Sequence, residues 1–280
     1  MKCISYSLFG YNRERQANCF DFASYLRGLM INVRMNRLLF PDWDIVLHLD
    51  RSTYEGFPLL FDGMGAQIRI ENEAPLCKAM LWRLKPCFER NDNNEAKYTH
   101  VICRDVDSPP TYRDAQAVAH WIQHDKAAHA ITDSISHTIP MMGGMIGFRP
   151  KYFTMYFGDS WENLVESRGI DYSVKGSDQT FINQVIYPKL AQPGEDSITQ
   201  HYVLGMGNTW LSDYNNHIPD IQLPLADALK ESNQVCGHIG AAGFYEPVMF
   251  KFLRPYWNDF KDLLTLESNY PNIFYWYADR

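Results

Sequence analysis

Short apolar runs alternate with longer amphipathic segments along the first 110 residues. Four runs have the length and the β-branched or aromatic content of buried strands: residues 3–9, 45–49, 66–70 and 98–104. Two segments between them, 12–38 and 76–88, carry apolar residues at helical spacing. Strands that alternate with helices pair in parallel, so the pattern predicts an α/β fold: a Rossmann-like, mostly parallel central sheet flanked by helices.

The second half of the chain continues with a less regular alternation. We expect strands at 127–131 and 141–148, and helices at 112–124, 151–157, 161–167 and 177–186, the last with a serine cap. Beyond residue 190 the sequence is rich in Pro, Gly, Asn and Asp, which favours loops that wrap a site. No linker or repeat divides the chain, so we expect one compact domain over 1–280, with halves at 1–110 and 111–250 and a helical, aromatic tail at 251–280.

Composition limits the classes of function. A chain of 280 residues that is 46% hydrophobic and 14% aromatic can bury a large core and is not disordered. Its 33 acidic and 26 basic side chains give a formal charge of -7, which disfavours a broad nucleic-acid surface. Five arginines crowd the first helical region: Arg13, Arg15, Arg27, Arg34 and Arg37. They form either a local basic patch for a charged partner or an ordinary solvated helix face.

The cysteines and the apolar runs indicate a compartment. The cysteines are scattered without a CxxC pair, which favours buried free thiols in a reducing compartment: Cys3, Cys19, Cys77, Cys87, Cys103 and Cys236. No run reaches the roughly 18 apolar residues that a membrane-spanning helix needs. The first apolar run is too short for a signal peptide. We therefore expect a cytoplasmic protein without a membrane span.

The run at 98–104 ends in two aspartates one residue apart, Asp105 and Asp107. Alternate residues of a strand point the same way, so both carboxylates can face one gap. Pro109 and Pro110 stop the strand there, at the carboxyl end of the sheet, where open α/β folds bind their ligands. Two close carboxylates repel unless a cation lies between them, and Mg²⁺ or Mn²⁺ prefers such oxygens. The alternative is a surface turn or helix cap.

The order of residues between Trp82 and Pro188 resembles a group of glycosyltransferases with the type-A fold. The likeness rests on Arg104–Ser108, Arg113–Val118 and several single residues further on: Trp121, His129, Asp133, His137, Pro140, Gly143, Gly144 and Met145. It implies that the 1–110 half binds a nucleotide-sugar, that a D-x-D motif holds the metal, and that 111–250 is the acceptor half. Pro109 stands where the family has arginine, so Arg104 or Arg113 would have to neutralise the donor phosphate.

The resemblance also implies roles for later residues. Residues 176–183 resemble the Asp-Gln segment of retaining, glycogenin-like transferases, where Asp178 and Gln179 would contact the donor sugar and favour retention. Alternatively, Asp178 only complements a helix dipole. His238, which lies between Gly237 and Gly240, looks like the family's third metal ligand, and an imidazole suits Mn²⁺ better than Mg²⁺.

The remaining candidate residues follow from position. Asp133 precedes the double-glycine strand and is the candidate general base for the acceptor, with a capping or turn role as the alternative. In similar proteins the helix that carries Arg83 packs under the carboxylates, which implies that Arg83 pairs with the donor phosphate or with Asp105. Gly143 and Gly144 lack side chains and would let the backbone approach a ligand. By comparison with similar folds, three further residues would contact the nucleobase and ribose, with short-range turn chemistry as the alternative: Ser5, Ser7 and Tyr11.

The sequence therefore predicts a metal-dependent glycosyltransferase that uses a nucleotide-sugar, with UDP as the commonest nucleotide at such sites. The acceptor hydroxyl belongs to a glycan or other saccharide or, as a second choice that the arginine-rich region leaves open, to a hydroxymethylated base in viral DNA. A haloacid-dehalogenase-like phosphatase also has D-x-D after a strand, but Pro109 stands where its motif wants Thr or Val. A non-catalytic sugar-binding module is the third interpretation.

Overall fold

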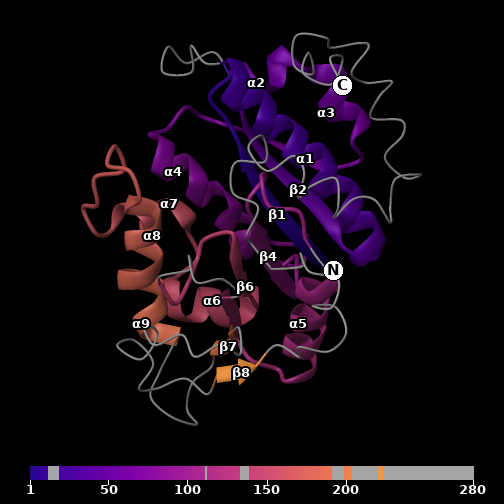
Figure 1. Cartoon of the computed structure of the whole chain (residues 1–280). Coiled ribbons are helices and arrows are strands. Elements are labelled where there is room, and N and C mark those ends of the chain that lie inside the picture. The colour runs from indigo at the N-terminus through magenta and orange to yellow at the C-terminus, as the bar shows by residue number, and fades with distance from the viewer. Residues whose placement is uncertain (12–18, 111, 133–138, 191–198, 204–219, 223–280) are drawn as a thin grey trace.

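The computed structural model describes residues 1–11, 19–110, 112–132, 139–190, 199–203 and 220–222, and a mixed β-sheet forms its centre (Figure 1). In the described residues the sheet has eight strands: β1 (Lys2–Leu8), β2 (Asp44–Asp50), β3 (Gln67–Glu71), β4 (His100–Arg104), β5 (Ala128–Thr132), β6 (Met145–Phe148), β7 (Thr199–Val203) and β8 (Asp220–Gln222). Their order is β3-β2-β1-β4-β6-β5-β7-β8. Strand β6 runs antiparallel to both neighbours, and every other pair is parallel.

Helices cover both faces of this sheet (Figure 1). One face carries α1 (Cys19–Leu39), α2 (Arg51–Gly56), α3 (Pro58–Gly63) and α5 (Tyr112–Gln123). The other face carries α4 (Leu76–Met80), the 3-10 helix η2 (Leu81–Phe88), α6 (Pro150–Phe157), α7 (Trp161–Glu166), α8 (Ser177–Phe181), the π-helical turn η3 (Ile182–Ile186) and α9 (Tyr187–Leu190). The α/β class that the sequence predicts is confirmed.

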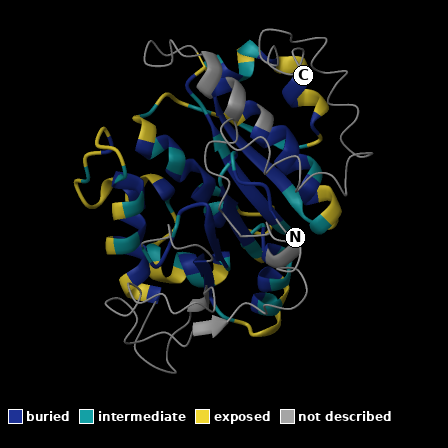
Figure 2. Ribbon diagram, in the orientation of Figure 1, coloured by how far each residue is buried: buried dark blue, intermediate teal, exposed yellow. Residues whose placement is uncertain are grey.

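The sheet separates two hydrophobic cores, because alternate strand residues point to opposite faces. In β1, Ile4 and Tyr6 join the core under α1, whereas Cys3 joins the core under η2. Strands β1, β2, β4, β5 and β6 are buried almost throughout, whereas the edge strand β3 is partly exposed (Figure 2). Because β1, β2 and β4 are parallel, the loops that follow them lie at the same edge of the sheet.

The first four strands begin and end within two residues of their predicted limits, and all four are parallel. Helices α2 and α3 were not predicted. The side chain of Asp50 caps α2 by accepting a hydrogen bond from the Thr53 N–H at 2.9 Å. Pro58 begins α3 at a position where a helix needs no N–H donor. Both helices are too short for the periodicity that marks longer ones.

The structure corrects several predicted boundaries. The helix predicted at 76–88 is a 3-10 helix from Leu81 onward. Pro86 lies inside this 3-10 helix and lacks an N–H, which favours the tighter last turns. The strand at 141–148 covers only Met145–Phe148. The serine cap at 177–186 is wrong: Gly176 is the N-cap, with φ 85°. Beyond 190, the expectation of loops alone is wrong at β7 and β8, which extend the sheet.

The cysteines and the helix lengths bear on the predicted compartment. Cys3, Cys77, Cys87 and Cys103 are buried free thiols, as predicted, and burial raises the pKa of Cys103 to about 12. The Cys19 side chain and Cys236 lie outside the described residues. Among the helices that the structure describes, none combines the length and the apolar character that crossing a bilayer requires.

A buried ion pair joins β4 to α5. Arg104 donates to both carboxylate oxygens of Asp114, from Nε at 2.9 Å and from Nη2 at 2.7 Å. Its Nη1 donates to the carbonyls of Cys103 and Ile146, at 2.8 and 3.0 Å. Both charged side chains are almost fully buried, at 1% and 2% exposed. Such a bidentate pair fixes one geometry between a strand and the helix above it.

We predict that Asp114→Ala lowers the free energy of unfolding by about 3–5 kcal/mol, because it leaves the Arg104 charge buried without its carboxylate. Urea unfolding measures the change. The control is Asp159→Ala, which removes an 83% exposed partner of Arg90 and should cost less than about 1 kcal/mol. Equal, small losses for the two variants would contradict the structural role of the buried pair.

Candidate functional site

A pocket of about 240 Å³ lies at the carboxyl ends of β1 and β4. Its lining combines acidic, basic and apolar residues: Ser7, Leu8, Phe9, Tyr25, Leu76, Met80, Arg83, Asp105, Val106, Asp107 and Gln179. Five of these were predicted from the sequence as site residues: Ser7, Arg83, Asp105, Asp107 and Gln179. The fold therefore brings together residues that are up to 172 positions apart in the chain, from Ser7 to Gln179.

The two acids of the D-x-D motif follow β4 directly. The strand ends at Arg104, and the Ser108 N–H donates to the Asp105 carbonyl at 3.2 Å, which turns the chain. Asp105 and Asp107 both line the pocket, and the Asp105 side chain is 40% exposed. The predicted stop at the end of this strand is confirmed. Two carboxylates with access to one cavity are a ligand set for a hard cation.

Arg83 lies beneath the acids, on η2. Its Nη1 forms an ion pair with Oδ1 of Asp105, and its Nη2 lies 4.0 Å from Oδ2 of Asp178. Nη2 is buried and has no hydrogen-bond partner among the described residues. Burial by itself would lower the pKa of Arg83, but the Asp105 and Asp178 carboxylates outweigh it and raise that pKa above its ordinary value. The site therefore contains a permanent cation, Arg83, and its Nη2 group can still donate a hydrogen bond.

Asp178 and Gln179 enter from α8. The Gly143 N–H donates to Oε1 of Gln179 at 3.1 Å, and Nε2 of Gln179 donates to Oδ2 of Asp178 at 3.3 Å. The orientation of the Gln179 amide is thereby fixed. Asp178 is 3% exposed and lies in the first turn of α8, so its carboxylate faces Arg83 as well as the N-terminal end of the helix. A loop-to-helix clamp reinforces the contact: Asn183 exchanges hydrogen bonds with the backbone of Met141.

Gly143 and Gly144 bring the backbone against these charged groups. A Cβ atom on Gly144 would overlap the Asp105 carboxylate. One on Gly143 would overlap Nη2 of Arg83 and lie 3.0 Å from Nε2 of Gln179. The glycines were predicted to permit close approach to a ligand. The close approach that the structure shows is to Arg83 and Asp105 themselves.

Three of the predicted donor-binding residues lie away from the pocket wall. Ser5 is fully buried within β1, and the Tyr11 ring packs on Phe22 and Phe57 at centroid distances of 5.2 and 4.8 Å. Arg104 points to the opposite face of the sheet from Arg83, toward Asp114. Adjacent residues of a strand point to opposite faces, so the position of Arg104 beside Asp105 in the sequence did not place its side chain at the site.

Asp133, His137 and His238 lie outside the described residues, and their roles stay predictions. His129 is buried in β5, where its ring stacks on Trp121 at 4.5 Å. Within the part of the chain that the structure describes, no three His, Cys, Asp or Glu side chains are grouped as a complete metal site. Asp105 and Asp107 would need a further ligand from elsewhere.

Sequence reasoning missed a buried polar network next to the acids. Tyr6, Asn32 and Asn36 are each at most 1% exposed and are linked by hydrogen bonds of 3.1 and 2.7 Å. A further bond of 2.8 Å joins Asn32 to the Val106 carbonyl. The available signal was the pair of asparagines four residues apart on the apolar face of a long helix, where a polar side chain requires partners.

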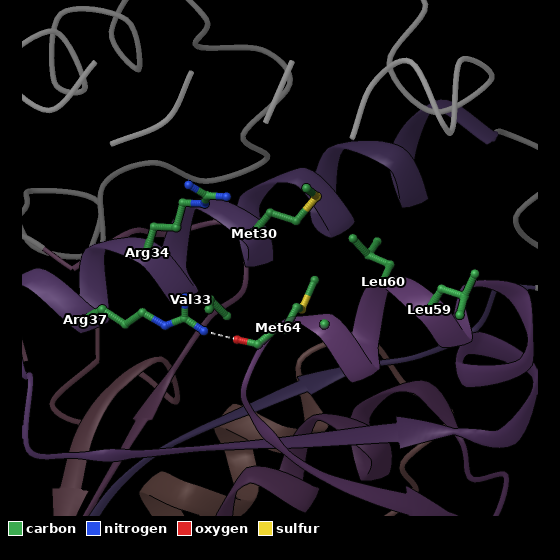
Figure 3. A pocket seen from close by; sticks show the side chains of 8 residues that line it. Met30, Val33, Arg34, Arg37, Leu59, Leu60 and Met64 are labelled. Atoms are coloured by element: carbon green, nitrogen blue, oxygen red, sulfur yellow. Dashed lines mark hydrogen bonds between the residues drawn. The ribbon is translucent and has the colours of Figure 1, made fainter. Parts of the chain in front are cut away.

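A second pocket, of about 120 Å³, lies between α1 and α3 (Figure 3). Its lining is mainly apolar but includes two members of the arginine group: Met30, Val33, Arg34, Arg37, Leu59, Leu60, Gly63 and Met64. Figure 3 shows Arg37 directed at the Met64 carbonyl, to which it donates a hydrogen bond. Arg13, Arg15 and the Arg27 side chain lie outside the described residues. Arg37 thus makes an internal contact with the end of α3.

Comparison with known proteins gives weak structural similarities. No family model and no curated protein match the sequence. A protein from Desulfovibrio desulfuricans G20 that is assigned as a nucleotide-diphospho-sugar transferase is 13% identical, with a TM-score of 0.41 over 67% of this chain and 76% of that chain. The 4-diphosphocytidyl-2C-methyl-D-erythritol synthase from Anaerococcus prevotii DSM 20548 is 10% identical, with a TM-score of 0.42 over 74% of this chain and 90% of that chain. Mouse xyloside xylosyltransferase 1 is 10% identical, with a TM-score of 0.38 over 85% of this chain and 96% of that chain.

We predict that Gly144→Ala lowers the free energy of unfolding by about 1–3 kcal/mol, because its Cβ would displace the Asp105 carboxylate from its pair with Arg83. Chemical denaturation measures this. Gly63→Ala is the matched control: nothing lies within 4 Å of its added Cβ, so the change should be neutral or stabilising by up to about 1 kcal/mol. If the two variants have equal free energies of unfolding, the close packing of Gly144 against Asp105 is contradicted.

Proposed function

We propose that this chain is a metal-dependent glycosyltransferase that moves a sugar from a nucleotide-sugar, with UDP as the nucleotide, to a hydroxyl acceptor. One observation carries the proposal: Asp105, Asp107 and the buried cation Arg83 line a single pocket at the carboxyl edge of an α/β sheet. This edge is where such sheets bind nucleotides.

The acids suit a divalent cation. Asp105, Asp107 and Asp178 carry three formal negative charges and Arg83 one positive charge, which leaves a formal sum of −3 + 1 = −2. A divalent cation balances that sum, and carboxylate oxygens are ligands that Mg²⁺ and Mn²⁺ accept. His238 would supply a third protein ligand and favour Mn²⁺. When bound, the cation supplies Lewis-acid stabilisation of the departing nucleoside diphosphate.

The remaining lining suits the donor. Arg83 has a buried N–H donor at Nη2 that no described residue accepts, and a phosphate oxygen would accept it as a charge-assisted hydrogen bond. The buried Ser7 hydroxyl has no partner among the described residues either, and it borders the same pocket. On the rim, Tyr25 and Leu76 are partly exposed, at 37% and 38%, and offer an apolar surface on which a nucleobase can lie.

Asp178 and Gln179 are the residues that would act on the sugar. Their side chains are held in one orientation by Arg83 and by the Gly143 N–H, so they face a reacting sugar without reorganising. A carboxylate and an amide oxygen would stabilise the positive charge that develops on the ring. The likeness of residues 176–183 to retaining transferases is what supports transfer with retention. Asp133 would accept the proton of the acceptor hydroxyl. A saccharide hydroxyl is preferred over a hydroxymethylated DNA base, because the chain carries a formal charge of -7.

We predict that a screen of nucleotide-sugars, with mass-spectrometric detection of released nucleotide, finds a donor whose turnover stops in EDTA. Asp105→Asn and Asp107→Asn should each reduce the rate by about a hundredfold or more, because each removes a charged ligand of the cation. Asp42→Asn is the matched control, since Asp42 is an exposed acid of a turn before β2, and its rate should not change.

Other results of these experiments would lead to different conclusions. Full turnover after removal of divalent ions, or unchanged rates in both aspartate variants, would refute the proposal. Release of inorganic phosphate from a phosphomonoester would favour the phosphatase interpretation. Donor binding without turnover against any saccharide or DNA acceptor would favour a binding module.

A further inference from the structure

The helix α1 is tied to the acidic loop by one fully buried side chain, Asn32. Its Nδ2 donates to the Val106 carbonyl at 2.8 Å and to the Gly28 carbonyl at 2.8 Å. Its Oδ1 accepts a hydrogen bond from the Tyr6 hydroxyl at 3.1 Å. Both N–H groups and the carbonyl oxygen of the amide are therefore engaged, which fixes its orientation.

The Val106 carbonyl lies between the two acids in the chain. It belongs to the peptide unit that joins Val106 to Asp107, so a hydrogen bond to its oxygen fixes the plane from which Asp107 extends. The helix also touches this peptide one turn earlier. A Cβ on Gly28 would overlap the Val106 oxygen and lie 3.0 Å from the Asp107 Cα. Gly28 and Asn32 thus form one docking face for residues 106–107.

The other acid is held from the opposite side of the sheet. Asp105 pairs with Arg83 on η2, whereas Asn32 lies on α1, and the two helices cover opposite faces of the sheet. The Asp105 carboxylate and the peptide that carries Asp107 are consequently anchored by two different buried groups. Loss of either group would let one carboxylate move relative to the other.

We propose that Asn32 is a positioning residue, which acts through the Val106 peptide to hold Asp107 at the separation from Asp105 that a divalent cation requires. This inference rests on the proposed function for the identity of the ligand. It does not rest on that function for the anchoring of the loop, which is a property of the protein alone. The two can therefore be tested separately.

The chain offers a matched control four residues along the same helix. Asn36 is 1% exposed and donates to the Tyr6 hydroxyl at 2.7 Å, so it belongs to the same buried network. Among the described residues, its side chain makes no hydrogen bond to the acidic loop. Replacing Asn36 disturbs the network and the stability of α1 but leaves the bond to Val106 in place.

The first test uses the metal-free full chain and follows amide hydrogen exchange in residues 104–108. The Ser108 N–H, which donates to the Asp105 carbonyl, is the reporter. We predict that Asn32→Leu speeds exchange in this segment roughly tenfold, the factor that corresponds to one lost buried hydrogen bond. Asn36→Leu should leave exchange there within about twofold of the wild type, the scatter allowed for a site that the substitution does not touch.

The second test is a Mn²⁺ titration of the same proteins. Asn32→Leu should weaken binding roughly tenfold or more, as substitutions that misorient metal ligands do, and Asn36→Leu should not. Gly28→Ala is a second variant in case Asn32→Leu does not fold. It keeps Asn32 but pushes the Val106 carbonyl away from α1, so it should change both measurements in the same direction.

The outcomes separate the two claims. Wild-type protein that binds no Mn²⁺ refutes the proposed function, and the positioning role for a metal falls with it. Wild-type binding together with unchanged exchange and affinity in the Asn32 and Gly28 variants overturns the positioning role alone. Equal effects of the Asn32 and Asn36 substitutions also overturn it, because they would show general destabilisation rather than placement of the loop.

Discussion

The guanidinium of Arg83, buried between Asp105 and Asp178, is the interaction on which the site depends. The two carboxylates come from different elements, a loop after β4 and the first turn of α8, and without a cation between them they would repel. The glycine pair at 143–144 closes over this cluster, because any larger residue would displace a charged group. The pocket floor is therefore formed by the fold itself before any ligand binds.

The site is held from both faces of the sheet. Arg83 reaches Asp105 from the core under η2, and Asn32 reaches the Val106 carbonyl from the core under α1. Buried polar groups of this kind are costly unless they are fully paired, and when paired they specify one arrangement. A metal site needs such rigidity, because the distance between its ligands decides which cation it accepts.

Local pattern predicted much of this architecture. Apolar runs located the first four strands, and Pro109 with Pro110 placed Asp105 and Asp107 at the end of β4. Contacts between distant segments could not be predicted in the same way. The short run at Met145–Phe148 identifies a strand but not its antiparallel direction. Asn32 was missed because its hydrogen-bond acceptor lies 74 residues away.

We propose that the aspartate pair and Arg83 bind a cation and a nucleoside diphosphate together. Isothermal titration of UDP, with Mn²⁺ and then with EDTA, tests it most directly. UDP should bind roughly tenfold or more tightly when Mn²⁺ is present, because each ligand neutralises the charge that opposes the other. Equal affinity for UDP in the two titrations would contradict it.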